Sequence, residues 1–178
     1  HLDLVVTDVD GARVLYGTGT GFTPGSYLDN FGFGGCDHVV TGDFDNDGHP
    51  DFVTSGQAVT LFRSDGTGHG WLRQSSPVGE NPVGIAAGDF DVDGNLDVAA
   101  ALYLGAAVSV YYGDGDGAFP VRQDWGVGLA PNHLAIGDLD GDAKPDFVAP
   151  SSQLDRADFQ VALNLGGRRF HARRDFDA

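Results

Sequence analysis

One twelve-residue pattern occurs three times in this chain, and it constrains the fold more than any other feature of the sequence. The pattern reads Gly-Asp-(Phe/Leu)-Asp-x-Asp-(Gly/Ala)-x-x-Asp followed by two apolar residues, and its copies span 42–53, 88–99 and 137–148. The first aspartates of the copies, Asp43, Asp89 and Asp138, are 46 and 49 positions apart. Repeats of about 40 to 50 residues are typical of propellers, in which each repeat forms one blade. The sequence therefore predicts a protein built from one repeated unit.

Each unit is expected to contain four short strands separated by turns. In the second complete unit these strands are predicted at 84–88, 96–101, 108–112 and 119–125, where β-branched and aromatic residues gather between glycine-rich turns. No stretch has a sustained helical period, so no helix is predicted. The predicted fold is an all-β propeller segment of four-stranded antiparallel blades. Residues 1–178 form one domain, with blades at about 1–30, 38–80, 83–128 and 133–178.

The first blade is predicted to lack its first strand. Residues 1–7 match 49–54, the part of the repeat that follows the aspartate loop. The prediction is thus three complete blades and one incomplete blade. Closed propellers have four to eight blades, and open sheet edges favour association. We therefore expect the chain to associate with copies of itself or with the remainder of a larger propeller.

Charge and composition exclude several classes of function. The chain has 26 acidic and 10 basic residues, a net charge of −16, which argues against a nucleic-acid partner. No apolar run approaches the ~20 residues of a membrane span. No serine-hydrolase, zinc-protease or paired-cysteine motif occurs, so we expect a protein that is not an enzyme. Glu80 is the sole glutamate, and aspartate is the acidic residue of turns and hard-cation sites.

The aspartates of the repeat have the spacing of a cation-binding loop. Side chains at loop positions one, three, five and nine, with the main-chain carbonyl of position seven, can supply most of the six to eight oxygens that calcium prefers. Gly48 and Gly94 at position six permit a left-handed turn, whereas Ala143 there predicts a weaker third site. The alternative is a set of ordinary Asp/Asn/Gly turns, but carboxylates gathered without a cation would repel one another.

The pattern resembles the FG-GAP/VCBS repeats of integrin-like β-propellers, and the resemblance covers essentially the whole chain. It implies that each loop joins the first two strands of a blade and holds a structural Ca²⁺, giving three sites. The first blade keeps only Asp3, so no complete fourth site is expected. The implied ligands are the side chains of Asp43, Asp45, Asp47, Asp51, Asp89, Asp91, Asp93, Asp97, Asp138, Asp140, Asp142 and Asp146, with the carbonyls of His49, Asn95 and Lys144.

The resemblance is less specific for function, because such propellers occur in adhesion receptors, lectins and secreted enzymes. We expect a secreted, calcium-stabilised recognition module that binds carbohydrate or an extracellular protein, since low lysine content and abundant aspartate suit an extracellular setting with millimolar calcium. One alternative is a non-catalytic propeller part of a secreted polysaccharide-active hydrolase or lyase. Another is a structural subunit of a larger extracellular assembly.

A few further side chains are candidates for contact with a ligand. Trp71 and Trp125, on predicted outer strands, can stack on sugars, although packing between blades is the interpretation we favour. The basic cluster at 168–174 offers a contact for an acidic glycan or a neighbouring chain, against the alternative of a solvated face.

Overall fold

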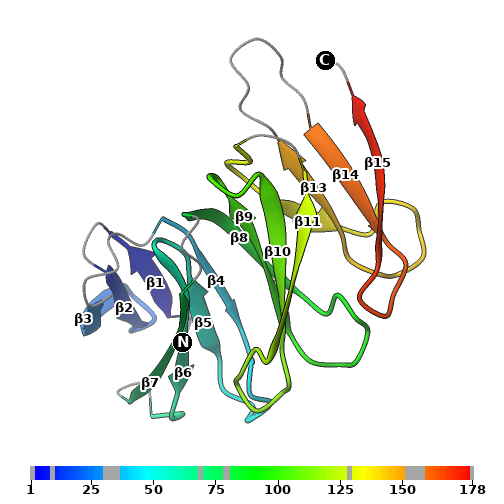
Figure 1. The fold of residues 1–178 in the computed structure, drawn as a ribbon. Helices are drawn as coiled ribbons and strands as arrows, with labels where there is room; N and C mark the ends of the chain where they lie inside the picture. Colours follow the sequence, from blue (N-terminus) through cyan, green and yellow to red (C-terminus); the bar gives the residue numbers. More distant parts are fainter. Residues whose placement is uncertain are drawn as a thin grey trace.

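A computed structural model describes residues 3–8, 11–29, 37–67, 70–77, 81–127, 130–150 and 159–176, without the side chains of 29, 77 and 172–176. Figure 1 shows strands throughout, and none of these residues is helical, so the all-β prediction is confirmed. None of the described residues belongs to a helix long and apolar enough to cross a membrane. The strands are β1 (Leu4–Thr7), β2 (Gly11–Gly17), β3 (Phe22–Asp29), β4 (Val39–Gly42), β5 (Asp51–Thr54), β6 (Ala58–Ser64), β7 (Trp71–Pro77), β8 (Pro82–Gly88), β9 (Asp97–Leu102), β10 (Ala107–Tyr112), β11 (Val121–Gly126), β12 (Ala135–Gly137), β13 (Asp146–Pro150), β14 (Phe159–Asn164) and β15 (Phe170–Phe176).

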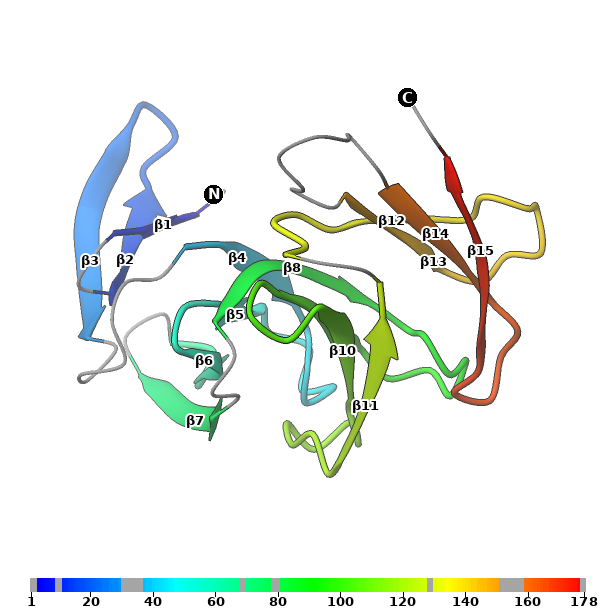
Figure 2. The ribbon, with the colours of Figure 1, turned by 45° about the horizontal axis from the view of Figure 1, so that its top comes forward.

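Consecutive strands pair antiparallel to form four separate sheets. Their orders are β1-β2-β3, β4-β5-β6-β7, β8-β9-β10-β11 and β12-β13-β14-β15, and we call them the first to the fourth sheet. Figure 2 shows the sheets side by side in an arc, with the first and fourth at its two ends. Neighbouring sheets meet along their inner strands, where β1 contacts β4, β4 contacts β8, and β8 contacts β12. The first sheet has three strands among the described residues, and each of the others has four.

The burial of the strands follows from their place in each sheet. The middle strands β5, β9 and β10 are buried along their whole length, because both of their faces meet a neighbouring sheet. The outer strand β11 alternates between half-buried and exposed residues, as expected where one face meets water. The middle strands of the repeat are therefore apolar because they are buried on both faces, and the outer strands are more polar because one face is exposed to water.

The hydrophobic core consists of three clusters, one for each contact between neighbouring sheets. Ala12, Val14, Phe52 and Phe62 fill the contact between the first and second sheets. The second contact is built around Phe44, Leu61, Val98 and Tyr111, and the third around Phe90, Val110, Tyr112 and Phe147. Since each cluster takes residues from two repeats, the apolar residues of each sheet are buried only by contact with the neighbouring sheet.

The strand limits differ from the predicted ones at a few points. The outer strand predicted at 119–125 begins at Val121, after a hairpin in which the Asp114 N–H donates to the Ala118 carbonyl. Pro120 has no N–H to give to the strand ladder, which explains the later start. Parts of the predicted blades, including residues 1–2, 9–10 and 151–158, lie outside the described residues.

Candidate metal centres

The three aspartate loops connect the first two strands of the second, third and fourth sheets. Each loop winds around the carboxylate at position one, which accepts the N–H groups of positions five and six. For Asp43 these donors are Asp47 at 3.1 Å and Gly48 at 3.0 Å. Asp89 and Asp138 accept the equivalent N–H groups at 2.9 to 3.1 Å. The loop is thus folded by its own side chains, as aspartate-initiated turns are.

The aspartate at position nine attaches the loop to the sheet. One oxygen of Asp97 accepts the Phe90 N–H at 2.7 Å, and the other accepts the Gly113 N–H, at the end of β10, at 2.8 Å. Asp51 and Asp146 make the same two contacts in their sheets. All three carboxylates are almost completely buried.

Positions one, three and nine bring their carboxylates together. In each loop one oxygen from each of the three residues lies within 4.8 Å of the other two, and the sets are Asp43, Asp45 and Asp51; Asp89, Asp91 and Asp97; Asp138, Asp140 and Asp146. The aspartate at position five lies outside this set and accepts the N–H of position seven, as Asp47 does from His49 at 2.8 Å. Coordination by Asp47, Asp93 and Asp142 and by the carbonyls of His49, Asn95 and Lys144 stays a prediction.

The position-three carboxylates fit a bound cation. Oδ1 of Asp45 and Oδ1 of Asp91 are buried, and no hydrogen-bond donor reaches them. The other oxygen of each residue faces a guanidinium, that of Arg63 at 3.4 Å and that of Arg168 at 2.8 Å. One arginine neutralises one of the clustered charges, whereas a buried acceptor without a donor costs about 1–3 kcal/mol. A hard cation with several oxygen ligands would satisfy these atoms.

The crowding of carboxylates also changes their acidity. The pKa of Asp97 is raised to about 7, mainly by burial and also by the charges of Asp91 and Asp89, while the N–H groups of Gly113 and Phe90 lower it. Burial raises the pKa of Asp51 in the same way, with added repulsion from Asp45 and Asp47. Without a cation, the position-nine carboxylate is therefore costly to ionise.

The loops contain a second left-handed position that the sequence analysis missed. Position six is left-handed as predicted, with φ of 87° at Gly48, 94° at Gly94 and 66° at Ala143. Position four is left-handed as well, with φ of 56° at Asn46, 64° at Val92 and 85° at Gly141. Asn46 and Gly141 suit this conformation, so they were the available signal, while the β-branched Val92 concealed it.

Sequence comparison adds an independent observation on the repeat. A model of the FG-GAP-like repeat matches residues 52–100 and 93–149, which together cover more than half of the chain. This chain belongs to the FG-GAP-like repeat family. The first FG-GAP-like match runs from β5 to β9 and includes the whole second aspartate loop. No curated protein matches the chain.

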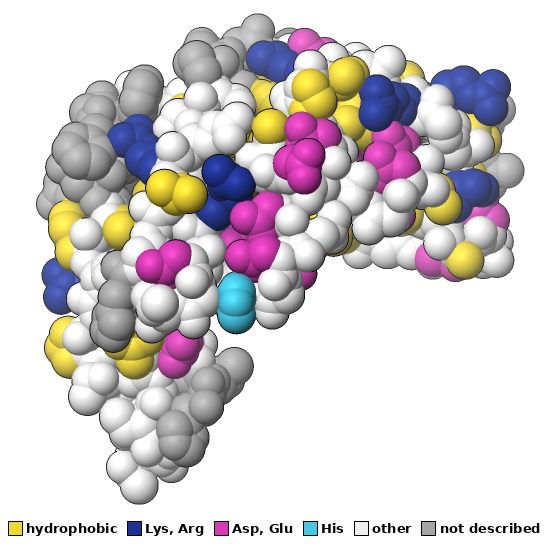
Figure 3. Space-filling model, turned by 90° about the horizontal axis from the view of Figure 1, so that it is seen from below, with side chains coloured by type: hydrophobic (Ala, Val, Ile, Leu, Met, Phe, Trp, Pro, Cys, Tyr) yellow, Lys and Arg dark blue, Asp and Glu magenta, His cyan; other side chains and the backbone are white. Residues whose placement is uncertain are grey.

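The next FG-GAP-like repeat contributes to the second loop. Arg168, from the hairpin between β14 and β15, pairs with Asp91 and lies 4.6 Å from the ring centre of Tyr112 in β10. The Asn164 side chain donates to the Phe90 carbonyl at 2.7 Å. Arg168 was expected in a surface cluster and is instead part of a contact between sheets. Figure 3 shows acidic side chains gathered in patches with basic side chains beside them.

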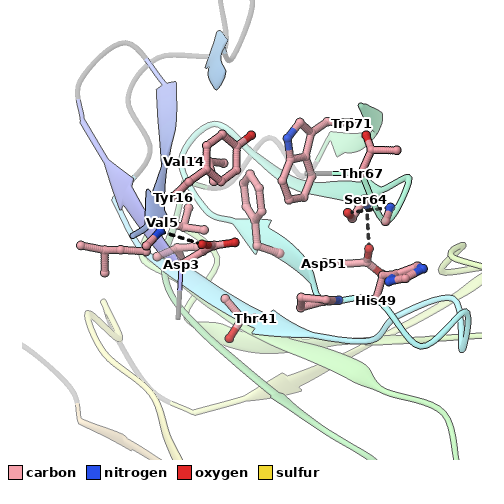
Figure 4. Close-up of a pocket in the computed structure, with 16 residues that line it drawn as sticks. Asp3, Val5, Val14, Tyr16, Thr41, His49, Asp51, Ser64, Thr67 and Trp71 are labelled. Atoms are coloured by element: carbon pink, nitrogen blue, oxygen red, sulfur yellow. Dashed lines mark hydrogen bonds between the residues drawn. The ribbon is translucent and has the colours of Figure 1, made fainter. Parts of the chain in front are cut away.

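The two tryptophans have different surroundings. Trp125 packs edge-on against Phe170, with ring centres 5.2 Å apart, which agrees with packing between repeats. Trp71 lies against Phe52 and lines a cavity of about 870 Å³ between the first and second sheets. Asp3, Tyr16 and Thr67 line the same cavity, as Figure 4 shows.

Proposed function

We propose that this chain is an extracellular, calcium-stabilised β-propeller module that recognises carbohydrate. FG-GAP-like repeats suggest propeller blades, and they are typical of extracellular proteins. The observation that carries the calcium part is the convergence of three carboxylates in every loop, with donor-free buried oxygens at Asp45 and Asp91. Calcium would be held by the predicted ligands of each loop. Bound calcium would neutralise the carboxylates of the loop and would thereby hold together the first two strands of a sheet.

Thermal unfolding with and without calcium tests this part. A ligand that binds the folded chain raises the melting temperature as its concentration increases. We expect the midpoint to rise with calcium between micromolar and millimolar concentrations and to fall in excess chelator. Calorimetric titration should then count three sites in the natural chain and two in Asp45→Asn. Equal midpoints in chelator and in calcium would contradict the proposal.

The cavity beside Trp71 supports carbohydrate as the ligand. The indole of Trp71 supplies an aromatic face that can stack on a sugar ring, and its N–H is buried without a hydrogen-bond acceptor. Asp3 and Thr41 place a carboxylate and a hydroxyl in the same cavity. Such pairing of an aromatic face with a few polar groups is typical of small-molecule sites.

A glycan array followed by product analysis tests recognition. We expect retention of an oligosaccharide without cleavage, loss of retention in Trp71→Ala, and partial retention in Trp71→Phe. Leu72→Ala is the matched control, because Leu72 is next to Trp71 in the chain and its side chain is exposed, and this variant should bind normally. Cleaved products would favour the hydrolase or lyase alternative, and unchanged binding by a folded Trp71→Ala chain would exclude this cavity.

A further inference from the structure

The hairpin between β10 and β11 contacts two aspartate loops at once. Its first residue, Gly113, donates its N–H to Asp97, at position nine of the second loop, at 2.8 Å. Two residues further along, the Gly115 carbonyl lies 3.4 Å from the side-chain nitrogen of Asn46, at position four of the first loop. The hairpin therefore lies between the first loop and the second.

Arg63 makes another connection between the first loop and this hairpin. Its guanidinium pairs with Asp45, at position three of the first loop, and donates to the Asp116 carbonyl at 3.0 Å. A Cβ added to Gly117 would lie 2.4 Å from Cδ of Arg63, so the arginine stem packs directly on the hairpin backbone. Arg63 thus connects a carboxylate of the first loop to the hairpin that holds Asp97 of the second.

The two loops are also joined directly by a pair of side-chain amides. Asn46 donates to Oδ1 of Asn95, at position seven of the second loop, at 2.9 Å. Gly115 lies against both amides, because a Cβ there would be 2.4 Å from Oδ1 of Asn95 and 2.6 Å from Nδ2 of Asn46. The first loop, the second loop and the hairpin therefore meet with no room for a further side chain.

The second and third loops lack an equivalent amide pair. Val92 occupies position four of the second loop, is 58% exposed, and has no side-chain group that forms hydrogen bonds. Lys144 occupies position seven of the third loop and pairs with Asp142 of its own loop. In the described part of the chain, the amide pair is thus a property of the first and second loops.

We propose that the first and second loops bind calcium cooperatively, with Asn46, Arg63 and the hairpin after β10 as the coupling element. The inference rests on the proposed calcium binding. An ion in either loop fixes side chains that the shared contacts also hold, so the second ion meets less of the ordering cost. The coupling is reciprocal, because each ion must raise the affinity of the other loop by the same factor. A hydrogen bond of average net strength corresponds to a coupling factor of about 5.

Calcium titration followed by two-dimensional amide NMR measures this factor. The N–H groups of Gly48 and Gly94 donate to the position-one carboxylates of the first and second loops, so each should shift when its own loop binds calcium. The two curves, fitted together to a two-site scheme, give both affinities and the coupling factor separately. We expect a factor of about 5 in the natural chain.

Asn46→Gly keeps a residue suited to positive φ and removes the amide donor, so it should lower the factor to below about 2. Val92→Gly is the matched control, since it places glycine at the same position of the second loop and removes no amide. It should change the affinity of the second loop and leave the factor at about 5. Asn95→Ala removes the acceptor instead, and it should reproduce the effect of Asn46→Gly if that variant does not fold.

Two results would overturn the coupling and leave the calcium proposal intact. One is a factor of about 1 in the natural chain, and the other is a factor that Asn46→Gly and Asn95→Ala leave unchanged. The absence of any calcium-dependent shift at Gly48 and Gly94 would instead overturn the proposed calcium binding, and the coupling with it.

Discussion

The second and third aspartate loops share their four aspartates and the glycine before them but have different neighbours. In the second loop, Asp91 is almost buried, because the hairpin of the fourth sheet lies over it and Arg168 reaches its outer oxygen. In the third loop, Asp140 is exposed, and no sheet of described residues covers it. The basic residue there, Lys144, belongs to the loop itself and pairs with Asp142.

The difference shows that the loop sequence determines only part of a metal centre. Equivalent backbone N–H groups hold the carboxylates of positions one and nine in both loops, with the Gly141 N–H as an additional donor to Asp138. The burial of position three, and the counter-charge that it receives, come from the repeat that follows. A loop motif in a tandem repeat therefore has to be judged together with its neighbour.

The largest effect is expected from removing the position-three carboxylate. Asp91→Ala should lower the free energy of unfolding in calcium by about 2 kcal/mol, since it removes a buried ligand and the partner of Arg168. Asp140→Ala, at the exposed equivalent, should lower it by less than about 1 kcal/mol. Urea denaturation measures both values, and Asp116→Ala is the control at an exposed aspartate outside the three loops. Equal losses at Asp91 and Asp140 would show that the neighbouring sheet does not matter.

The next largest effect is expected from lowering the pH, which should weaken calcium binding at the second loop. The pKa of Asp97 is raised to about 7 from 3.8, so the metal-free folded chain holds a proton that the unfolded chain has lost between these values. Without metal, Asp97 therefore contributes stability to the folded chain below about pH 4, and this contribution is lost as the pH rises to about 7. Calcium needs the ionised form, so its affinity at this loop should fall on the order of 20-fold from pH 7.5 to pH 5.5.

Calorimetric titration at the two pH values measures this change in affinity. Asp97→Asn cannot titrate and serves as the control, with weak binding at both pH values. A calcium affinity at the second loop that is the same at pH 5.5 and at pH 7.5 would contradict the raised pKa.

The smallest effects are expected from the left-handed positions. Val92→Gly should stabilise the second loop by about 1 kcal/mol, because a β-branched residue is strained at positive φ and Val92 is exposed. Ala143→Gly should strengthen the third loop by a smaller amount, and Gly94→Ala should weaken the second. Calcium titration and melting temperatures rank the three variants. If Val92→Gly has no effect while Ala143→Gly does, position six alone limits affinity.

The sequence could predict the features that each repeat carries within itself. The alternation of apolar strands with glycine-rich turns predicted the antiparallel sheets. The aspartate spacing predicted that the carboxylates of positions one, three and nine meet, but it also included position five, which lies outside the cluster. The contacts between repeats could not be predicted from the sequence. Arg168 and Asp91 are 77 residues apart, and nothing in either segment indicates that they pair. Val92 gave no signal of positive φ, because its residue type disfavours that conformation.

The contact of Arg168 with Asp91 also has a consequence for synthesis on the ribosome. At roughly 5–20 residues per second, the 77 residues between them take about 4–15 s to appear. During that interval the second loop is complete in sequence but lacks its covering hairpin. The nascent chain should therefore mature from its N-terminus to its C-terminus, each sheet becoming fully ordered only when the next one has emerged.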